Sequence, residues 1–214
     1  IKYPLGGIRG AAQLLSRELP DSSLDEYTNI IIQEADRLRN LVDKMLGPHQ
    51  PTSMEPINIH EVMERVSAII YAESGGALTI ERDYDPSIPP LPGDKEQLIQ
   101  AILNVVRNAW ESLEDAGMKD TGEITLLTRI QRQFTIGRFH HNLVCRIDII
   151  DNGPGIPQEI IEDIFYPMIS GRAKGTGLGL AISQQLISQH LGLICCESRP
   201  GRTKFSIYIP MEQK

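Results

Sequence analysis

Residues 151–180 read DNGPGIPQEIIEDIFYPMISGRAKGTGLGL, and the rest of the chain is organised around them. The stretch opens on a turn that bears a carboxylate, Asp151, and closes on a glycine-rich run that leads into a helix. Backbone N–H groups at such a helix N-terminus attract phosphate, and the two cations between the ends, Arg172 and Lys174, match that charge. The pattern predicts a nucleotide-binding site, provided that other parts of the chain supply the remaining residues that line it.

The composition is that of an ordinary globular chain. Its 214 residues are 41% hydrophobic and 23% charged, which is typical of a water-soluble protein. The formal net charge of −7 argues against nonspecific binding to nucleic acid or to anionic membranes. No apolar run is long enough to cross a bilayer, and the first residues do not resemble a signal peptide, so we expect a cytoplasmic protein without membrane contact. The cysteines Cys145, Cys195 and Cys196 are expected to be reduced thiols.

Residues 1–47 predict a helical hairpin. Apolar residues recur at helical spacing up to Leu19, a Pro-Asp-Ser-Ser turn follows, and a seven-residue repeat then runs through Leu24, Ile31, Leu38 and Met45. Two helices cannot bury such a seam alone, so we expect a homodimer built as a four-helix bundle. The alternative is a hairpin that packs on its own C-terminal domain. Residues 48–56 are expected to be a linker.

Residues 57–214 predict an α+β domain, an α/β sandwich with a mostly antiparallel sheet. Helices are expected after Asn58 and after Asp94, because both side chains can cap a helix N-terminus. Strands are expected at residues 78–84, 121–130, 143–150, 194–197 and 204–209, and a helix at 180–191. The polar residues 131–142 are interpreted as a long connection with two solvated histidines, His140 and His141.

The helix after Asp94 carries two asparagines, Asn104 and Asn108, one turn apart and away from its apolar residues. Asparagine is a poor helix former, so a ligand role accounts for the pair as well as a solvent-exposed position does. A side-chain carbonyl oxygen suits a Mg²⁺ ion that bridges phosphates. We therefore assign the metal to Asn108.

The turn after residue 150 is expected to hold the base of the nucleotide. A carboxylate accepts a hydrogen bond from the amine of adenine and repels the carbonyl of guanine, so Asp151 is expected to select adenine. Gly153 and Gly155 carry no side chain, which lets the base approach the backbone closely. Asp-Asn-Gly is also a common turn in proteins without a ligand.

The glycine-rich run is expected to hold the phosphates. Gly175, Gly177 and Gly179 lead into the helix whose N-terminal amides and dipole attract anions. Arg172 and Lys174 lie in a segment bounded by glycines and are expected to close over the phosphates. The run is neither a P-loop nor the dinucleotide-binding fingerprint, because the residues and spacing of both differ.

In this order and at these separations, the features resemble the ATP-binding domain shared by sensor histidine kinases, gyrase and MutL-type proteins. The two asparagines look like the N box of that family, residues 151–155 the G1 box, residues 165–168 the F box and residues 175–180 the G2 box. Thr203 resembles the threonine that supports the adenine site. The ATP-binding residues implied by the resemblance are Asn104, Asn108, Asp151, Gly153, Gly155, Phe165, Arg172, Lys174, Gly175, Thr176, Gly177, Leu178, Gly179, Leu180 and Thr203.

The N-terminal hairpin resembles the dimerisation and phosphotransfer domain of sensor histidine kinases. Gyrase and MutL relatives hydrolyse ATP with a glutamate one turn before the metal-binding asparagine, and here that position is Asn104, which cannot act as a general base. Serine-kinase anti-sigma factors share the nucleotide site but lack the hairpin. The resemblance therefore favours phosphoryl transfer to protein over hydrolysis of ATP.

In the sensor kinases, the phosphoryl group passes from ATP to a histidine and then to an aspartate of a response regulator. The acceptor lies in an H-E-x-x-N/T-P-L pattern, and Ile1 to Leu5 align with the end of it. We expect the acceptor histidine and its glutamate just before Ile1, so this chain alone should bind ATP without autophosphorylating. Tyr3 stands where relatives have the Asn or Thr thought to position water for dephosphorylation of the regulator.

Residues 1–15, 37–43 and 165–168 resemble the nitrogen-regulation branch of the sensor kinases. That resemblance implies two protein partners, an NtrC-type response regulator and a PII-type signal protein. Relatives of this branch also dephosphorylate the regulator, but the phenol of Tyr3 is bulkier than Asn or Thr, so the resemblance does not settle phosphatase activity for this chain. The competing class is a noncatalytic dimeric ATP-binding scaffold, because the acceptor histidine is absent from this sequence.

Overall fold

The computed structural model describes residues 2–18, 27–32, 35, 53–169 and 177–212. The chain divides into two compact units, Ile1–Gln50 and Pro51–Lys214.

The first unit is helical in its described residues. Helix α1 spans Lys2–Glu18, as its apolar spacing predicts, and residues 27–32 are also helical. Ala12, Thr28 and Ala35 are buried in one copy of the chain. Large apolar side chains of the same unit remain exposed, namely Ile8, Leu14, Leu15, Tyr27, Ile30 and Ile31. Leu24, Leu38 and Met45 of the predicted seven-residue repeat lie outside the described residues.

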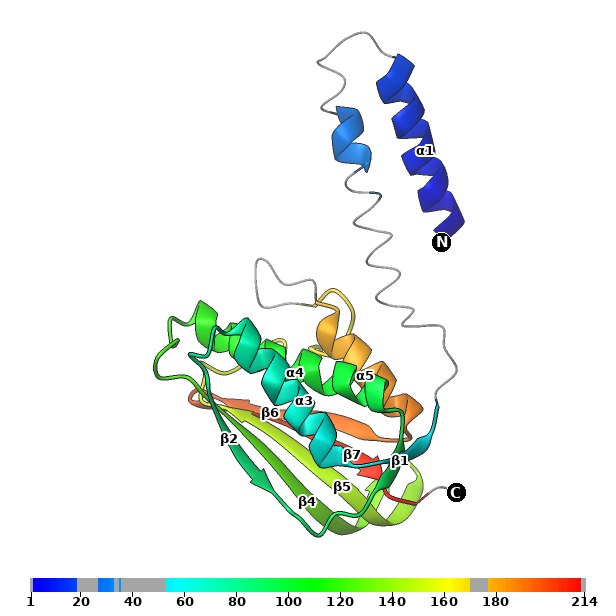
Figure 1. The fold of residues 1–214 in the computed structure, drawn as a ribbon. Coiled ribbons are helices and arrows are strands. Elements are labelled where there is room, and N and C mark those ends of the chain that lie inside the picture. Colours follow the sequence, from blue (N-terminus) through cyan, green and yellow to red (C-terminus); the bar gives the residue numbers. More distant parts are fainter. Residues whose placement is uncertain (1, 19–26, 33–34, 36–52, 170–176, 213–214) are drawn as a thin grey trace. The chain divides into compact units, whose positions relative to one another are not determined.

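The second unit is built on a five-stranded sheet with the strand order β2-β4-β5-β7-β6 (Figure 1). Its strands are β2 (Thr79–Tyr84), β4 (Glu123–Ile136), β5 (Phe139–Asp151), β6 (Leu193–Arg199) and β7 (Arg202–Pro210). Only the β2–β4 pairing is parallel among the described strands of this sheet. The predicted mostly antiparallel sheet is confirmed. A second, two-stranded sheet pairs β1 (Glu55–Ile57) with β3 (Leu91–Gly93).

One face of the large sheet is covered by α3 (Ile59–Glu73), α4 (Lys95–Asp115) and α5 (Gly179–Gln189) (Figure 1). Both predicted caps are confirmed. The Asn58 side chain accepts the His60 N–H at the start of α3, and the Asp94 side chain accepts the Gln97 N–H at the start of α4.

The core lies between these helices and the sheet. The predicted apolar face of α4 is buried throughout, at Leu98, Ile102, Val105, Val106, Ala109 and Leu113. Helix α4 contacts β5, and residues that alternate along β5 and β7 are buried as well, at Ile147, Ile149, Phe205 and Ile207. Full burial of each large apolar side chain contributes about 1.5–3 kcal/mol. These contacts hold α4 and its two asparagines in place over the sheet.

Residues 131–142, interpreted from the sequence as a long connection, extend the sheet instead. Strands β4 and β5 continue their ladder to Ile136 and Phe139, so the connection is a two-residue turn at Gly137 and Arg138. Gly137 has a φ of 60°, which such a tight turn favours. The expected solvated loop is therefore wrong, and His141 is buried in the strand. The polar composition misled because this part of the sheet is partly exposed.

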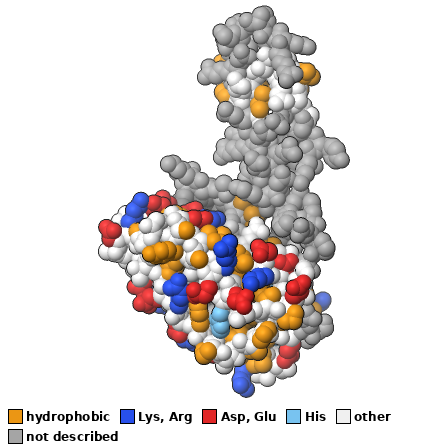
Figure 2. Space-filling model, in the orientation of Figure 1, with side chains coloured by type: hydrophobic (Ala, Val, Ile, Leu, Met, Phe, Trp, Pro, Cys, Tyr) orange, Lys and Arg blue, Asp and Glu red, His pale blue; other side chains and the backbone are white. Residues whose placement is uncertain are grey.

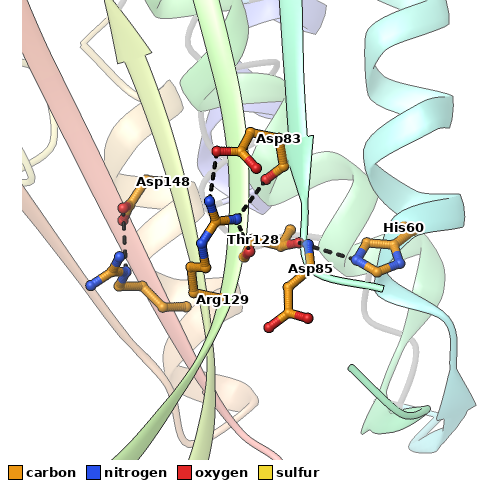
Figure 3. Close-up of polar contacts among 7 residues, drawn as sticks. His60, Asp83, Asp85, Thr128, Arg129 and Asp148 are labelled. Carbon is orange, nitrogen blue, oxygen red and sulfur yellow. Dashed lines mark hydrogen bonds and ion pairs between the residues drawn. The ribbon is translucent and has the colours of Figure 1, made fainter. Parts of the chain in front are cut away.

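A polar cluster joins α3 to the edge of the sheet (Figure 3). The hydroxyl of Thr128 in β4 accepts the backbone N–H of Asp85 at 3.1 Å and lies 3.1 Å from His60 Nε2. On the other face of β4, the Arg129 guanidinium donates to the Asp83 carboxylate at 2.6 Å. These contacts fix the parallel edge strand β2, and they explain the cluster without a ligand.

Acidic and basic side chains are interspersed over the face of the second unit seen in Figure 2. Among the described residues, no helix is both long and apolar enough to cross a membrane.

Candidate functional site

Asp151 lies at the carboxyl end of β5 with 4% of its surface exposed. Its Oδ1 accepts the Gly153 N–H at 2.9 Å, so the carboxylate organises the turn that follows it. A Cβ on Gly153 would lie 2.7 Å from this oxygen. In the sheet, Asp151 pairs with Thr203 of β7, which is also 4% exposed. The structure thus brings Thr203 beside Asp151, although the two lie 52 positions apart in the sequence (203 − 151 = 52).

The turn after β5 is docked on the β6–β7 hairpin. The Gly201 N–H donates to the Gly153 carbonyl at 2.9 Å. Gly155 has a φ of 89°, and a Cβ there would lie 2.9 Å from the carbonyl carbon of Arg199. The fold itself therefore requires glycine at 155, a reason that is separate from the predicted approach of a base.

Asn104 joins α4 to the start of α5. Its Nδ2 donates to the Gly179 carbonyl at 3.3 Å, and the Ser183 hydroxyl oxygen lies 3.0 Å from the same carbonyl oxygen and 2.9 Å from that of Ala101, either of which can accept its proton. Asn108 lies one helical turn further along α4 and is half-buried. Asn104 of the predicted asparagine pair and Gly179, the last glycine of the glycine-rich run, are therefore adjacent.

The N-terminus of α5 differs from those of α3 and α4. Where the two earlier helices begin at Asn58 and Asp94, α5 begins after Leu178, whose side chain makes no capping hydrogen bond. Leu178 is 1% exposed and packs inward. The first N–H groups of a helix have no partner within it, and without a polar cap they suit an external anion. This helix end is where the sequence predicts the phosphates.

Two parts of the predicted site flank residues 170–176. Phe165 packs edge-on against Phe205 of the core, with ring centroids 6.4 Å apart. The Met168 N–H donates to the Gly177 carbonyl at 3.0 Å, and a Cβ on Gly177 would lie 2.7 Å from the Met168 carbonyl carbon. Both residues have a positive φ, 68° at Met168 and 63° at Gly177. Leu180 is half-buried in the first turn of α5.

Four predicted ATP-binding residues lie outside the described residues, namely Arg172, Lys174, Gly175 and Thr176. Their role in holding phosphate stays a prediction. Tyr3 lies in the first turn of α1, and its side chain is not among those described.

The thiol of Cys196, close to Asp151, is expected to be unreactive. Burial raises the pKa of Cys196 to about 12, and the negative charge of Asp151 adds to the shift. The thiol therefore stays protonated at neutral pH, which disfavours its use as a nucleophile.

Two serines belong to the site and escaped the sequence prediction. Ser183 ties α5 to α4, and Ser198 of β6 lies 2.9 Å from the Thr203 hydroxyl. A signal for Ser198 was present: the sequence Ser-Arg-Pro-Gly-Arg-Thr is a tight hairpin that places residues 198 and 203 opposite each other. The signal for Ser183 was weak, because a serine inside a helix usually bonds within that helix.

The chain belongs to the family of histidine kinase-, DNA gyrase B- and HSP90-like ATPases, whose model matches residues 93–213. The model of the His Kinase A (phospho-acceptor) domain matches residues 1–49. A phospho-acceptor domain followed by an ATPase domain is the domain order of a sensor histidine kinase.

Curated relatives are sensory histidine kinases/phosphatases named NtrB. The protein of Salmonella typhimurium is 53% identical over 213 residues, which is 100% of this chain and 60% of that protein. The protein of Vibrio alginolyticus is 52% identical over 99% of this chain and 59% of its own length. The protein of Rhodobacter capsulatus is 42% identical over 100% of this chain and 60% of its own length. This chain thus spans about 60% of the length of these relatives.

Solved structures share the fold. The catalytic domain of the histidine kinase ThkA superposes with a TM-score of 0.61 at 25% identity, over 74% of this chain and 96% of that domain. Full-length ShkA in complex with AMPPNP superposes with a TM-score of 0.65 at 21% identity, over 100% of this chain and 44% of ShkA. ThkA in complex with the response regulator TrrA gives 0.61 at 23% identity, over 99% of this chain and 59% of ThkA.

Proposed function

We propose that the second unit binds ATP with Mg²⁺ and presents its γ-phosphoryl group for transfer. The observation that carries this proposal is the N-terminus of α5, which lacks a polar cap and is held against Asn104 of α4. Family membership, and the AMPPNP bound by the fold neighbour ShkA, support the same ligand class. A nucleoside triphosphate supplies the anion that this helix end suits.

The residues of the site divide the work between base and phosphates. Asp151 accepts from the adenine amine, with Thr203 beside it in the sheet. The amides at Gly179 and Leu180 bind phosphate, and Asn108 offers a neutral oxygen to Mg²⁺. Arg172 and Lys174 add positive charge to the same phosphates. Asn104 places an amide where a hydrolytic relative has a general base, which favours transfer over attack by water.

For the whole protein we propose an ATP-dependent histidine kinase of a nitrogen-regulating two-component system. It passes phosphate to a histidine and then to an aspartate of an NtrC-type response regulator. The NtrB relatives and the regulator-bound structure of ThkA support this proposal. A PII-type signal protein is the proposed regulator of the balance between kinase and phosphatase, and the cytoplasm the proposed location.

We propose that the first unit forms a homodimer. Its apolar side chains at Ile8, Leu15 and Ile31 stay exposed in one copy, and a second hairpin would bury them. The match to the phospho-acceptor domain supports this arrangement. Sedimentation of the chain should show a dimer, whereas a monomer at micromolar concentration would contradict it.

Labelled ATP tests the reaction class. The longest natural form of the protein, incubated with γ-labelled ATP and Mg²⁺, should acquire label that is stable in base and labile in acid. The 214-residue chain should bind the nucleotide and acquire no label, because none of its histidines lies in an H-E-x-x-N/T-P-L pattern. Nucleotide binding without label on either form would instead favour the noncatalytic scaffold.

Replacement of Asn108 tests the metal. Asn108→Ala should weaken binding of ATP about tenfold with Mg²⁺ and leave binding in EDTA unchanged, because only the metal-bridged contact is lost. Gln100→Ala, two turns earlier on α4, serves as the control. An equal loss with and without Mg²⁺ would remove Asn108 from the metal.

A further inference from the structure

Ser198 lies beside Thr203, on the side of the site where adenine is proposed to bind, and its hydroxyl makes two contacts. Its hydroxyl oxygen accepts the Ile156 N–H at 2.8 Å, at the end of the turn that begins with Asp151. The same oxygen lies 2.9 Å from the Thr203 hydroxyl, across the β6–β7 hairpin. Thr203 pairs in turn with Asp151 across β5 and β7. A row of side chains thus leads from the Ile156 amide to the base-binding carboxylate.

A hydroxyl can donate one hydrogen bond and accept two, so its role depends on its neighbours. Ser198 accepts from a backbone N–H whose position is fixed by the docked turn. If Ser198 then donates its own proton to Thr203, the Thr203 proton must point elsewhere. Thr203 becomes a donor toward the Asp151 side of the site.

The direction of that proton matters for base selection. Adenine presents an amine donor next to a ring-nitrogen acceptor, whereas guanine presents a carbonyl acceptor next to a ring N–H donor. A carboxylate beside a hydroxyl whose proton points into the site matches adenine, directly or through one bridging water. A hydroxyl free to rotate could accept from guanine instead, and part of the selection would be lost.

We propose that Ser198 is a specificity-determining positioning residue, which holds the Thr203 hydroxyl as a hydrogen-bond donor and thereby favours adenine over guanine. The proposal rests on the proposed ATP site and extends it to a residue that contacts Thr203 and Ile156. Ser198 acts through Thr203, and Asp151 supplies the complementary acceptor.

The ratio of ATP affinity to GTP affinity tests the proposal. It is measured by titration of the 214-residue chain with each nucleotide in the presence of Mg²⁺. Ser198→Ala should lower the ratio about five- to tenfold, the value of one hydrogen bond in a partly buried site. Ser198→Thr, which keeps the hydroxyl, should restore most of it. An unchanged ratio in Ser198→Ala would overturn the proposal.

A double-mutant cycle separates positioning from a structural effect on the turn. In a Thr203→Val background, Ser198→Ala should no longer change the ratio, because the hydroxyl through which it acts is gone. Equal effects in both backgrounds would show that Ser198 acts through the turn at Ile156, and would overturn the proposal. Ser206→Ala is the matched control, since Ser206 is buried in the same strand as Thr203 and lies on the opposite face.

Unfolding midpoints of all variants are compared first, so that a change in the ratio of ATP to GTP affinity is interpreted only for folded protein.

The proposed ATP site and the proposed role of Ser198 are contradicted by different results. Absence of ATP binding by the unsubstituted chain contradicts the ATP site itself. Binding with a clear preference for ATP that Ser198→Ala leaves intact contradicts only the role of Ser198.

Discussion

At position 155, a hydrogen atom in place of a methyl group lets the turn after β5 lie on the β6–β7 hairpin. An added Cβ would lie 2.9 Å from the Arg199 carbonyl carbon, and the backbone has a φ of 89°. Gly155→Ala should therefore cost about 2–4 kcal/mol in the free energy of unfolding, from conformational strain and overpacking together. Urea denaturation measures it.

Gly137→Ala is the matched control for that substitution. Gly137 also has a positive φ, 60°, but nothing lies within 4 Å of an added Cβ. Its cost should be about 1–2 kcal/mol, the strain of the backbone alone. Equal costs for the two variants would contradict the close approach at 155.

The carboxylate and the glycines of this turn are predictable from the sequence, but a base that approaches them is only part of the reason for them. Asp151 and Gly153 were expected to face a base, and the structure adds that they hydrogen bond to each other. Ser198 could be found only once the β6–β7 register was known, because its partners are Ile156, in the turn after β5, and Thr203, across the hairpin. Contacts that cross strands are set by register, and a single sequence specifies register weakly.

Among the elements, the parallel edge strand β2 depends on one hydroxyl of β4. Thr128 is 0% exposed, and its oxygen serves both the Asp85 N–H and His60 Nε2. Thr128→Val keeps the shape and leaves both groups without this partner, so the free energy of unfolding should fall by about 1–3 kcal/mol. Thr125→Val, on the opposite face of the same strand, should change it by less than about 0.5 kcal/mol. Similar losses at the two positions would refute the role of the hydroxyl.

A buried thiol in the central strand β5, that of Cys145, should make the free energy of unfolding fall as the pH rises above 9. Burial raises the pKa of the Cys145 thiol from 9.0 to about 12. Above pH 9 the unfolded chain loses this proton and the folded chain keeps it, so the stabilisation present below pH 9 is lost as the pH rises toward 12. The slope contributed by one such group is about 1 kcal/mol per pH unit.

The variant Cys145→Ala should unfold with a shallower dependence on pH between 9 and 11 than the unsubstituted chain. The comparison uses the slope alone, so the loss of packing at Cys145, which acts at every pH, cancels. Identical slopes would show that this thiol titrates equally in the folded and unfolded states. Denaturant unfolding at a series of pH values gives both slopes.

Periodicity identified the elements better than polarity did. The helix α4 and its buried face were predicted from apolar spacing, because an amphipathic helix carries its orientation in its own sequence. The extension of β4 and β5 through residues 131–142 was missed, because a partly exposed hairpin has the composition of a loop.

For the whole molecule, the fold class followed from the order of elements, and the proposed reaction depends on the combination of two units. The fold of Pro51–Lys214 is shared with proteins of different activities, so it indicates a nucleotide and not a reaction. The phospho-acceptor match over residues 1–49 adds the proposed transfer to histidine.

The central claim is that the site around Asp151 and the N-terminus of α5 binds ATP, and calorimetric titration tests it most directly. The 214-residue chain should bind Mg-ATP with one saturable site per chain and should bind Mg-GTP at least about tenfold more weakly. Asp151→Asn should reduce that preference, because the amide can rotate to donate to the guanine carbonyl. Absence of saturable ATP binding, or equal affinity for ATP and GTP in the unsubstituted chain, would contradict the account.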